Sequence, residues 1–189
     1  VSNPSNQTNE DTSDKLIKYL IKNKHWSPLE MVSVCLEIET TRDIARQMLR
    51  HRSFSFQEFS QRYADPTKDM EFVTREARLQ DSKNRQNSVA LDSDNDLHVA
   101  WKIKQLSIIH ECKLAYSWAI DNGIAKEQAR VVLPEGLTMS RMYMNGTLRS
   151  WVHYIELRTA NGTQKEHMEV AKYCAFEIAK IFPLMNEII

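Results

Sequence analysis

Residues 31–40 place the strongest limit on the fold of this chain, because their side chains alternate between two kinds. Apolar side chains occupy the even positions and mostly polar ones the odd positions: Val32, Val34, Leu36 and Ile38 alternate with Ser33, Cys35, Glu37 and Glu39. Successive side chains of a strand point to opposite faces of a sheet. The pattern therefore predicts a half-buried strand, and with it a sheet that has one covered face.

Helical periodicity accounts for most of the other regular segments. We expect helices over residues 14–24, 94–122 and 147–158, and a last helix that is stopped by Pro183. The long helix has an apolar stripe, and so does the last one; the two stripes are Leu97, Trp101, Ile108, Cys112, Ala115 and Ala119, and Met168, Ala171, Ala175, Ile178 and Phe182. We interpret these stripes as core or as a contact between subunits.

The segments between these helices supply further strands and loops. Residues 54–60 and 138–144 are expected to be strands, and Asn145-Gly146 to turn the chain after the second of them. Residues 64–93 look irregular, which is typical of a functional lid or a disordered segment. Residues 2–13 are polar and indicate a flexible loop.

A short helix is expected directly after the strand at 31–40. Thr40-Thr41-Arg42-Asp43 resembles a capping box with Asp43 as its acidic member. Arg42, Arg46 and Arg50 are spaced four apart, so they share one face of this helix. We interpret Arg42 as part of a solvated basic stripe, whereas Arg50 lies at the helix end and is assigned to ligand binding.

The composition excludes several classes of protein. Lysine plus arginine and aspartate plus glutamate both number 25, so no overall field attracts nucleic acid or a membrane. No apolar run approaches the ~20 residues of a membrane span. Three widely spaced cysteines argue against a disulfide framework and against a metal site, and for a reducing, cytoplasmic compartment. We expect one domain of 189 residues.

Glycine content restricts how a nucleotide could bind. The chain has four glycines, and none of them forms Gly-x-Gly-x-x-Gly or a P-loop, so a Rossmann-type site is excluded. A dinucleotide would have to be met by arginines and exposed backbone donors. No cysteine lies in an electropositive turn, so no thiol nucleophile is indicated.

The segment 47–63 concentrates the groups that could meet such a ligand. It contains Arg50-His51-Arg52, followed by Ser55, Glu58, Ser60 and Arg62. Arginines offer forked, charge-assisted donors to phosphate. If the part after Phe54 is extended, Glu58, Ser60 and Arg62 share one face. An alternative is a single-stranded nucleic-acid-binding module over 50–62, in which phenylalanines of this segment stack on bases; zero net charge and Glu58 argue against it.

This segment resembles the signature of the flavin-dependent thymidylate synthases, in which Arg-His-Arg is followed at fixed spacing by Ser, Glu, Ser and Arg. Every fixed position is present. The resemblance continues in His25-Trp26-Ser27-Pro28-Leu29-Glu30 and in Ala129-Arg130-Val131-Val132-Leu133-Pro134. It implies a mixed α/β (α+β) fold, with a small, largely antiparallel sheet that includes 31–40 and 54–60 and is packed by long helices. It also implies a homotetramer whose sites draw on several subunits.

The resemblance implies reductive methylation of dUMP to dTMP without an enzyme nucleophile. FAD reduced by NADPH would supply the hydride, and methylenetetrahydrofolate the carbon. The residues implied for dUMP are Gln47, Arg50, Glu58, Ser60, Gln61, Arg62, Arg130 and Arg158. Those implied for FAD are Ser27, Arg50, His51, Arg52, Glu58, Arg149 and His153, with His25 and Glu30 in support. Arg158 would favour loss of the uracil N3 proton as the catalytic cation.

Three positions stay open at this stage. Gln86 lies in a Gln/Asn-rich loop, where the family contacts its substrate. The segment 159–167 departs from the family's pattern, so His167 either takes the place of a family histidine or has no role. The opening Val1-Ser2 is similar to the end of a family element, from which we expect a short strand and helix to precede the chain.

Overall fold

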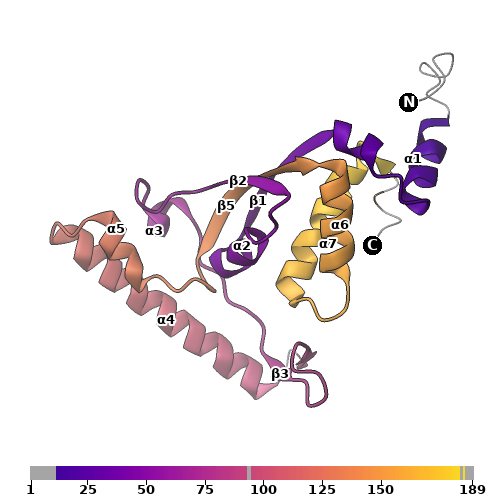
Figure 1. The fold of residues 1–189 in the computed structure, drawn as a ribbon. Coiled ribbons are helices and arrows are strands. Elements are labelled where there is room, and N and C mark those ends of the chain that lie inside the picture. The colour runs from indigo at the N-terminus through magenta and orange to yellow at the C-terminus, as the bar shows by residue number, and fades with distance from the viewer. Residues whose placement is uncertain (1–11, 93–94, 184, 186–189) are drawn as a thin grey trace.

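The computed structural model describes residues 12–92, 95–183 and 185 (Figure 1). The elements, with η for 3₁₀ helices, are α1 (Ser13–Lys22), η3 (Ser27–Met31), β1 (Ser33–Thr41), α2 (Arg42–Met48), β2 (Phe54–Glu58), α3 (Pro66–Asp69), β3 (Arg78–Gln80), β4 (Ser88–Ala90), α4 (Asp96–Asp121), α5 (Lys126–Ala129), η4 (Arg130–Val132), β5 (Met139–Thr147), α6 (Leu148–Thr159) and α7 (Lys165–Ala179). The expected mixed α/β fold with a small antiparallel sheet is confirmed. Residues 2–11 of the loop expected over 2–13 lie outside the described residues.

The main sheet has the order β1-β5-β2, and β5 pairs antiparallel with both neighbours. The expected turn at Asn145-Gly146 is wrong, because β5 continues through both residues to Thr147. Gly146 lies opposite Val34 on one side and Phe54 on the other. A Cβ at Gly146 would lie 2.5 Å from the nearest atom of the Phe54 ring, so glycine lets this ring approach the central strand closely.

Helices α2, α6 and α7 cover one face of this sheet (Figure 1). The alternation of β1 is confirmed, since Ile38 is buried while Glu37 and Glu39 are exposed. The core joins the inner sheet face to the helices, and its fully buried members include Ile44, Met48, Met142, Met144, Leu148, Trp151, Tyr154, Ile155 and Ile178. The opposite face of β1 and β5 is polar and open to solvent.

The stripe expected on α4 is confirmed only in part: Cys112 and Ala119 are buried as expected, but its other members are not. Leu97, Trp101 and Ile108 are exposed, whereas the buried positions are Gln105, Ile109, Cys112, Tyr116 and Ala119. These steps of four and three form one face, which packs on α5 and Leu133 in a second, smaller core. Helix α4 lies away from the sheet (Figure 1). It exposes a long apolar surface to solvent.

Within the segment 64–93, which was expected to be irregular, the described residues 64–92 contain regular structure. They contain α3 and the antiparallel hairpin of β3 and β4. Two clamps hold the segment: Gln105 bonds the backbone N–H and carbonyl of Arg75 at 2.8 Å, and the Arg75 guanidinium binds Asp43 at 2.7 and 2.8 Å. Asp43 is therefore an ion-pair partner, and the expected capping box is not formed at Thr41. None of the described helices is long and apolar enough to span a membrane.

Candidate active site

The residues predicted to bind ligands fall into three groups within one chain. The first group lies where α2 ends near the last turn of α6. The second joins η3 to the first turns of α6. The third surrounds the end of β2 and the segment α5–η4. Helix α6 connects the first two groups, since Arg149 and Arg158 are nine residues, or roughly 13 Å, apart along it.

The first group is built on a contact between Arg158 and His51. The Nε–H of Arg158 donates to Nε2 of His51 at 2.9 Å, so that imidazole nitrogen is an acceptor. Burial, and then the charge of Arg158, lowers the pKa of His51 to about 4. The ring is therefore neutral near pH 7, and it meets the Tyr154 ring edge-on with 4.9 Å between centroids. Arg158 thus carries the positive charge of this pair.

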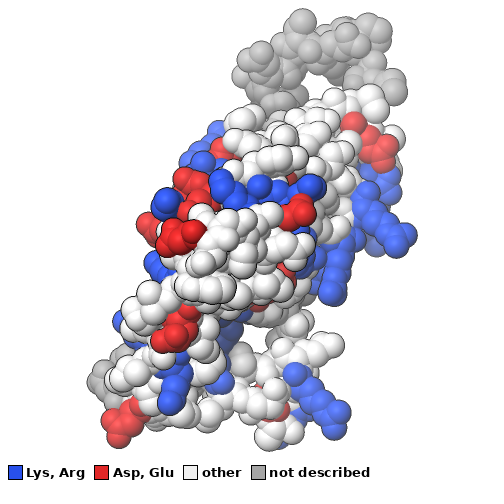
Figure 2. Space-filling model, turned by 90° about the vertical axis from the view of Figure 1, so that its left-hand side faces the viewer, with Lys and Arg blue, Asp and Glu red and all other residues white. Residues whose placement is uncertain are grey.

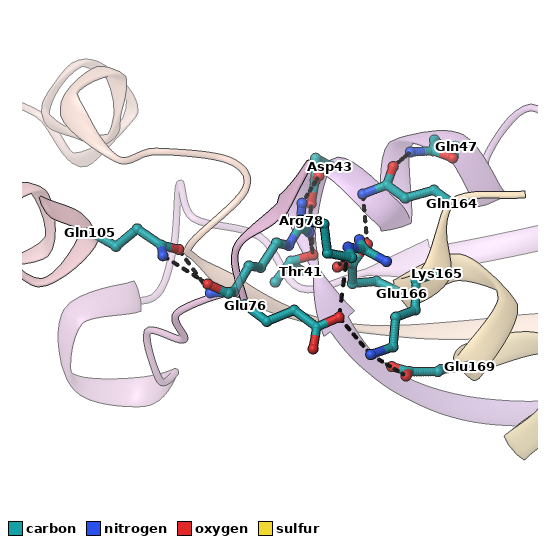
Figure 3. Close-up of polar contacts among 11 residues, drawn as sticks. Thr41, Asp43, Gln47, Glu76, Arg78, Gln105, Gln164, Lys165, Glu166 and Glu169 are labelled. Carbon is teal, nitrogen blue, oxygen red and sulfur yellow. Dashed lines mark hydrogen bonds and ion pairs between the residues drawn. The ribbon is translucent and has the colours of Figure 1, made fainter. Parts of the chain in front are cut away.

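Gln47 and His167 stand beside this pair. His167 is fully buried, its Nε2 lies 3.1 Å from the Tyr154 hydroxyl, and its Nδ1 lies 3.3 Å from Oε1 of Gln47. The Gln47 amide in turn donates to Gln164 at 2.8 Å (Figure 3). His167 is therefore packed behind Gln47, and the contact with Gln164 could not be foreseen from the sequence pattern.

The second group brings together residues assigned to FAD. Glu30 of η3 forms an ion pair with Arg149, and the Trp26 ring lies 4.5 Å from that of His153. Ser27 is exposed beside them. His25 points instead toward Tyr19 of α1, with 5.9 Å between ring centroids. The structure thus joins Glu30 to this group through Arg149, and gives His25 no contact with it.

The turn between α2 and β2 presents two unneutralised cations. Arg50 and Arg52 are exposed, and within the described part of the chain their guanidinium groups make no hydrogen bond or ion pair. Two free guanidinium groups on one turn suit a ligand with adjacent phosphates, such as a dinucleotide. The chemistry of this turn therefore fits the pyrophosphate of FAD.

The third group contains a buried arginine that was expected at the surface. Arg42 was expected on a solvated stripe, but it is buried and its Nη1 lies 3.4 Å from Oε1 of Glu58. Burial lowers the pKa of Arg42, while the charge of Glu58 acts in the opposite direction. The same carboxylate oxygen accepts from the Ser140 hydroxyl at 2.8 Å, and the other lies 3.8 Å from Arg46. Glu58 is thus held by three partners.

The extended conformation expected through Arg62 is wrong beyond Glu58, because β2 ends there and the chain turns. Ser60 and Arg62 approach each other through this turn, in which the Arg62 backbone N–H donates to the Ser60 hydroxyl at 3.4 Å. The Arg62 guanidinium lies 3.3 Å from Glu127, whose carbonyl accepts from Arg130 at 3.3 Å. Two arginines implied for dUMP thus contact the same residue of α5.

Gln61 lies within the same turn and is 4% exposed. Its Nε2 has no hydrogen-bond partner among the described residues. An unpaired buried amide is costly unless a ligand or water satisfies it. This amide is therefore available to an acceptor that approaches the turn.

Phe54 of the signature is not available for stacking on bases. Phe54 is buried between the sheet and α6, where it contacts the rings of Trp151 and Tyr154. Basic and acidic side chains also lie side by side over the molecular face in Figure 2, with uncharged surface between them. Neither feature supports a nucleic-acid-binding module.

A separate open cavity of about 1020 Å³ lies between the β3–β4 hairpin, the first turns of α4 and residues 161–168. Of the residues singled out from the sequence for ligands, only Gln86 lines it. Its wall also includes Gln164 and Glu166, which sequence reasoning did not select. Among the described residues, no group of histidine, cysteine and carboxylate side chains could hold a metal ion.

Two of the three cysteines are buried, and the third lies on the solvent face of the sheet. Cys112 and Cys174 are buried, and burial raises the pKa of both thiols, that of Cys174 to about 12. Cys35 is exposed on the solvent face of β1, away from the covered face on which α6 packs. The thiolate needed for nucleophilic attack is thus disfavoured at both buried positions.

Comparison with known proteins gives a consistent result. The sequence matches the family described as thymidylate synthase complementing protein over residues 1–184. It is 48% identical over 183 residues to a probable flavin-dependent thymidylate synthase of Paramecium bursaria Chlorella virus 1, covering 97% of this chain and 83% of that protein. The flavin-dependent thymidylate synthase of Synechocystis sp. is 47% identical over 183 residues, with 97% and 82% covered.

A solved structure shares the fold. The crystal structure of the UMP/dUMP methylase PolB from Streptomyces cacaoi, bound with 5-Br UMP, has a TM-score of 0.81 and 28% identity, covering 95% of this chain and 83% of that one. The signature between Arg50 and Arg62 is complete, and the similarity to curated relatives extends over nearly the whole chain. This protein belongs to the family of flavin-dependent thymidylate synthases.

Proposed function

We propose that this chain converts dUMP to dTMP by reductive methylation, with methylenetetrahydrofolate as carbon donor and FAD, reduced by NADPH, as hydride donor. The observation that carries the proposal is the contact between Arg158 and His51, which joins the signature to a helix 107 residues away in sequence. This contact puts a cation beside the turn that bears Arg50 and Arg52. The names of the relatives and of the PolB structure support the same reaction.

Arg158 supplies the electrostatic part of this mechanism. A cation beside a uracil ring stabilises the anion formed by loss of the N3 proton, which makes the ring more electron-rich at carbon. His51 is neutral at pH 7, so the positive charge stays on Arg158. As the acceptor of the hydrogen bond from Arg158, His51 orients the guanidinium group. Bound flavin supplies the hydride that converts a one-carbon methylene unit into a methyl group.

The proposal assigns no covalent role to the protein. Both buried thiols have raised pKa values. A serine nucleophile needs a base within hydrogen-bond reach, and within the described part of the chain the Ser60 hydroxyl bonds only the Arg62 backbone N–H. Ser60 therefore acts as a hydrogen-bonding group to the nucleotide. Binding, orientation and charge stabilisation remain as the contributions of the chain.

The turn after β2 is the proposed phosphate site of dUMP. Arg62 and Arg130 each contact Glu127 beside this turn, which also holds the unpaired amide of Gln61 and the Ser60 hydroxyl. A nucleotide phosphate would displace Glu127 from Arg62, an exchange that costs little because both side chains are about half exposed. Glu58, held by Arg42 and Ser140, fixes the strand end from which this turn begins.

The flavin would lie along the other two groups. Arg50 and Arg52 would meet its phosphates, and Ser27, Arg149 and His153 would hold it near the start of α6. The turn that bears Arg50 and Arg52 precedes β2 and the phosphate turn follows it, so the two lie at opposite ends of this strand. We therefore propose a homotetramer in which neighbouring copies complete each site. The exposed apolar surface of α4, which includes Val99, Trp101, Ile103, Leu106, Leu114 and Trp118, is available for such contacts.

Tritium release from 5-labelled dUMP tests this function directly. Release and dTMP formation should require FAD, NADPH and methylenetetrahydrofolate together, because methylenetetrahydrofolate would supply the carbon, reduced FAD the hydride, and NADPH the electrons that reduce FAD. Purified protein should also show flavin absorbance in the visible range. Tritium release that proceeds unchanged without flavin would refute the proposal.

A further inference from the structure

A chain of hydrogen bonds runs from the core to the open cavity through Gln47. It begins at the Tyr154 hydroxyl, which lies 3.1 Å from His167, and His167 lies 3.3 Å from Oε1 of Gln47. Gln47 then donates to Gln164 at 2.8 Å, and Gln164 donates to Oε2 of Glu166 at 2.9 Å (Figure 3). Each link joins side chains, so the donor at one link decides the donor at the next.

The carboxylate sets the direction of this chain. An ionised Glu166 can only accept, so the amide nitrogen of Gln164 faces it and its oxygen faces Gln47. Gln47 therefore turns its nitrogen to Gln164 and its oxygen to His167. His167 then carries its proton on Nδ1, and its Nε2 accepts from the Tyr154 hydroxyl. One ionised group thus decides the orientation of two amides and one imidazole.

Several features keep Glu166 ionised. Burial alone would raise the pKa of its carboxyl, but a hydrogen bond from its own backbone N–H, the one from Gln164 and the charge of Arg78 together lower it. The Arg78 guanidinium lies 2.7 Å from Oε1 of Glu166. Both partners are less than one quarter exposed, at 15% and 21%. This end of the hydrogen-bond chain is therefore anchored to β3, the strand that carries Arg78.

The orientation of Gln47 determines what it can offer to a ligand. Its oxygen is turned toward His167, which is fully buried, so this acceptor faces the interior. Its nitrogen lies beside Gln164, which lines the open cavity, and keeps a second N–H. Arg158 stands nearby through His51, whose ring centroid is 6.4 Å from that of His167. Arg158 also offers only donors.

We propose that Glu166 and Gln164 are positioning residues that make Gln47 a hydrogen-bond donor, so that the site selects uracil over cytosine. This inference rests on the proposed function. A uracil ring presents carbonyl oxygens at positions 2 and 4, whereas cytosine replaces the second of these with an amino group. An N–H of Gln47 and the guanidinium of Arg158 can both donate to the carbonyl oxygens of uracil. With cytosine, a donor of the site would face the amino group, which is also a donor.

The test is the Glu166→Gln substitution, because glutamine can donate as well as accept and so removes the fixed direction. We expect it to weaken dUMP binding by the FAD-loaded protein about tenfold, and to reduce the preference for dUMP over dCMP by a similar factor. Calorimetric titration with each nucleotide measures both values. Gln164→Met, which breaks the link while leaving Glu166 with Arg78, should give the same two changes.

Glu76→Gln is the matched control. Glu76 lies at the same junction, where it accepts from Lys165 at 2.6 Å and lies 3.7 Å from Arg78, but the described residues show no hydrogen bond between it and Gln164. It should leave the nucleotide preference unchanged. Equal preferences for dUMP over dCMP in wild type, Glu166→Gln and Gln164→Met would overturn the inference while leaving the proposed function intact. The inference would also fail if Glu76→Gln lost this preference as strongly as Glu166→Gln. Wild type that binds no pyrimidine nucleotide would overturn both.

Discussion

Arg158 and His51 form a hydrogen bond of 2.9 Å in which the guanidinium is the donor and the imidazole the acceptor. The geometry requires a neutral His51, and burial together with the charge of Arg158 lowers its pKa to about 4. A protonated ring could not accept this bond and would place two cations together. The pair therefore holds one positive charge in a defined direction, beside the turn that carries Arg50 and Arg52.

The first prediction compares Arg158 with Ser60. Arg158→Ala should reduce dTMP formation by about 10²–10³-fold at saturating dUMP, because the uracil anion loses its counter-charge. Ser60→Ala should keep measurable turnover, because the hydroxyl only hydrogen-bonds. The measurement is the rate of dTMP formation per mole of enzyme, with the flavin content determined for each variant. Arg158→Lys keeps the charge without the fork and should lie between wild type and Arg158→Ala.

Two results would contradict these roles. One is a near-normal rate in Arg158→Ala. The other is a dead Ser60→Ala variant that still binds dUMP and FAD normally, since this would require a covalent or acid-base role for the hydroxyl.

The second prediction concerns Arg62. Arg62→Ala should weaken dUMP binding by roughly ten- to a hundredfold, the usual effect of losing one charge-assisted phosphate contact, and should change FAD binding less. Its partner Glu127 provides the control, because the pair is 55% and 49% exposed and contributes little to stability. Glu127→Gln should therefore leave the melting temperature and the dUMP affinity close to wild type. Equal losses of dUMP and FAD affinity in Arg62→Ala would show that the residue is misassigned.

The third prediction tests the central strand. A Cβ at Gly146 would lie 2.5 and 2.6 Å from two atoms of the Phe54 ring, and pairing on both sides prevents β5 from moving away. Gly146→Ala should therefore lower the free energy of unfolding by about 1–3 kcal/mol. At Gly136 the nearest atoms to a Cβ are 3.8 Å away, so Gly136→Ala is the matched control and should be close to neutral. Denaturant unfolding at one protein concentration compares the two, and similar losses would refute the explanation.

The elements that could be predicted are those whose pattern reports burial directly. The alternation of β1 and the spacing of α6 and α7 reflect one buried and one exposed face, so periodicity located them. Asn145-Gly146 misled because this dipeptide is typical of hairpins, whereas pairing with β1 and β2 keeps β5 extended. The stripe on α4 was only partly right, because its buried face includes Gln105, which a hydrophobic pattern cannot select.

The signature located the site, but its contacts depend on distant segments. Arg42 has the spacing of a surface stripe, and only the fold reveals that it is buried against Glu58, which also accepts from Ser140. Gln47 was selected, but Gln164 and His167 lie 117 and 120 residues further along the chain. Contacts between such separated side chains follow from how α7 packs beside α2, which no local pattern records.

The last prediction concerns acid stability. Burial, followed by the charges of Arg158 and His51, lowers the pKa of His167 to about 4, against about 6.5 in an unfolded chain. Between these two values the unfolded chain binds a proton that the folded chain does not, so the free energy of unfolding falls as pH decreases from about 6.5 to about 4. The slope from this one residue is at most about 1.4 kcal/mol per pH unit. His167→Asn keeps a donor toward Gln47 but does not titrate, so its unfolding free energy should fall less steeply in this window. Denaturant unfolding at pH 7, 6, 5 and 4.5 measures the difference between the two proteins, and parallel curves would mean that His167 is not held neutral by the fold.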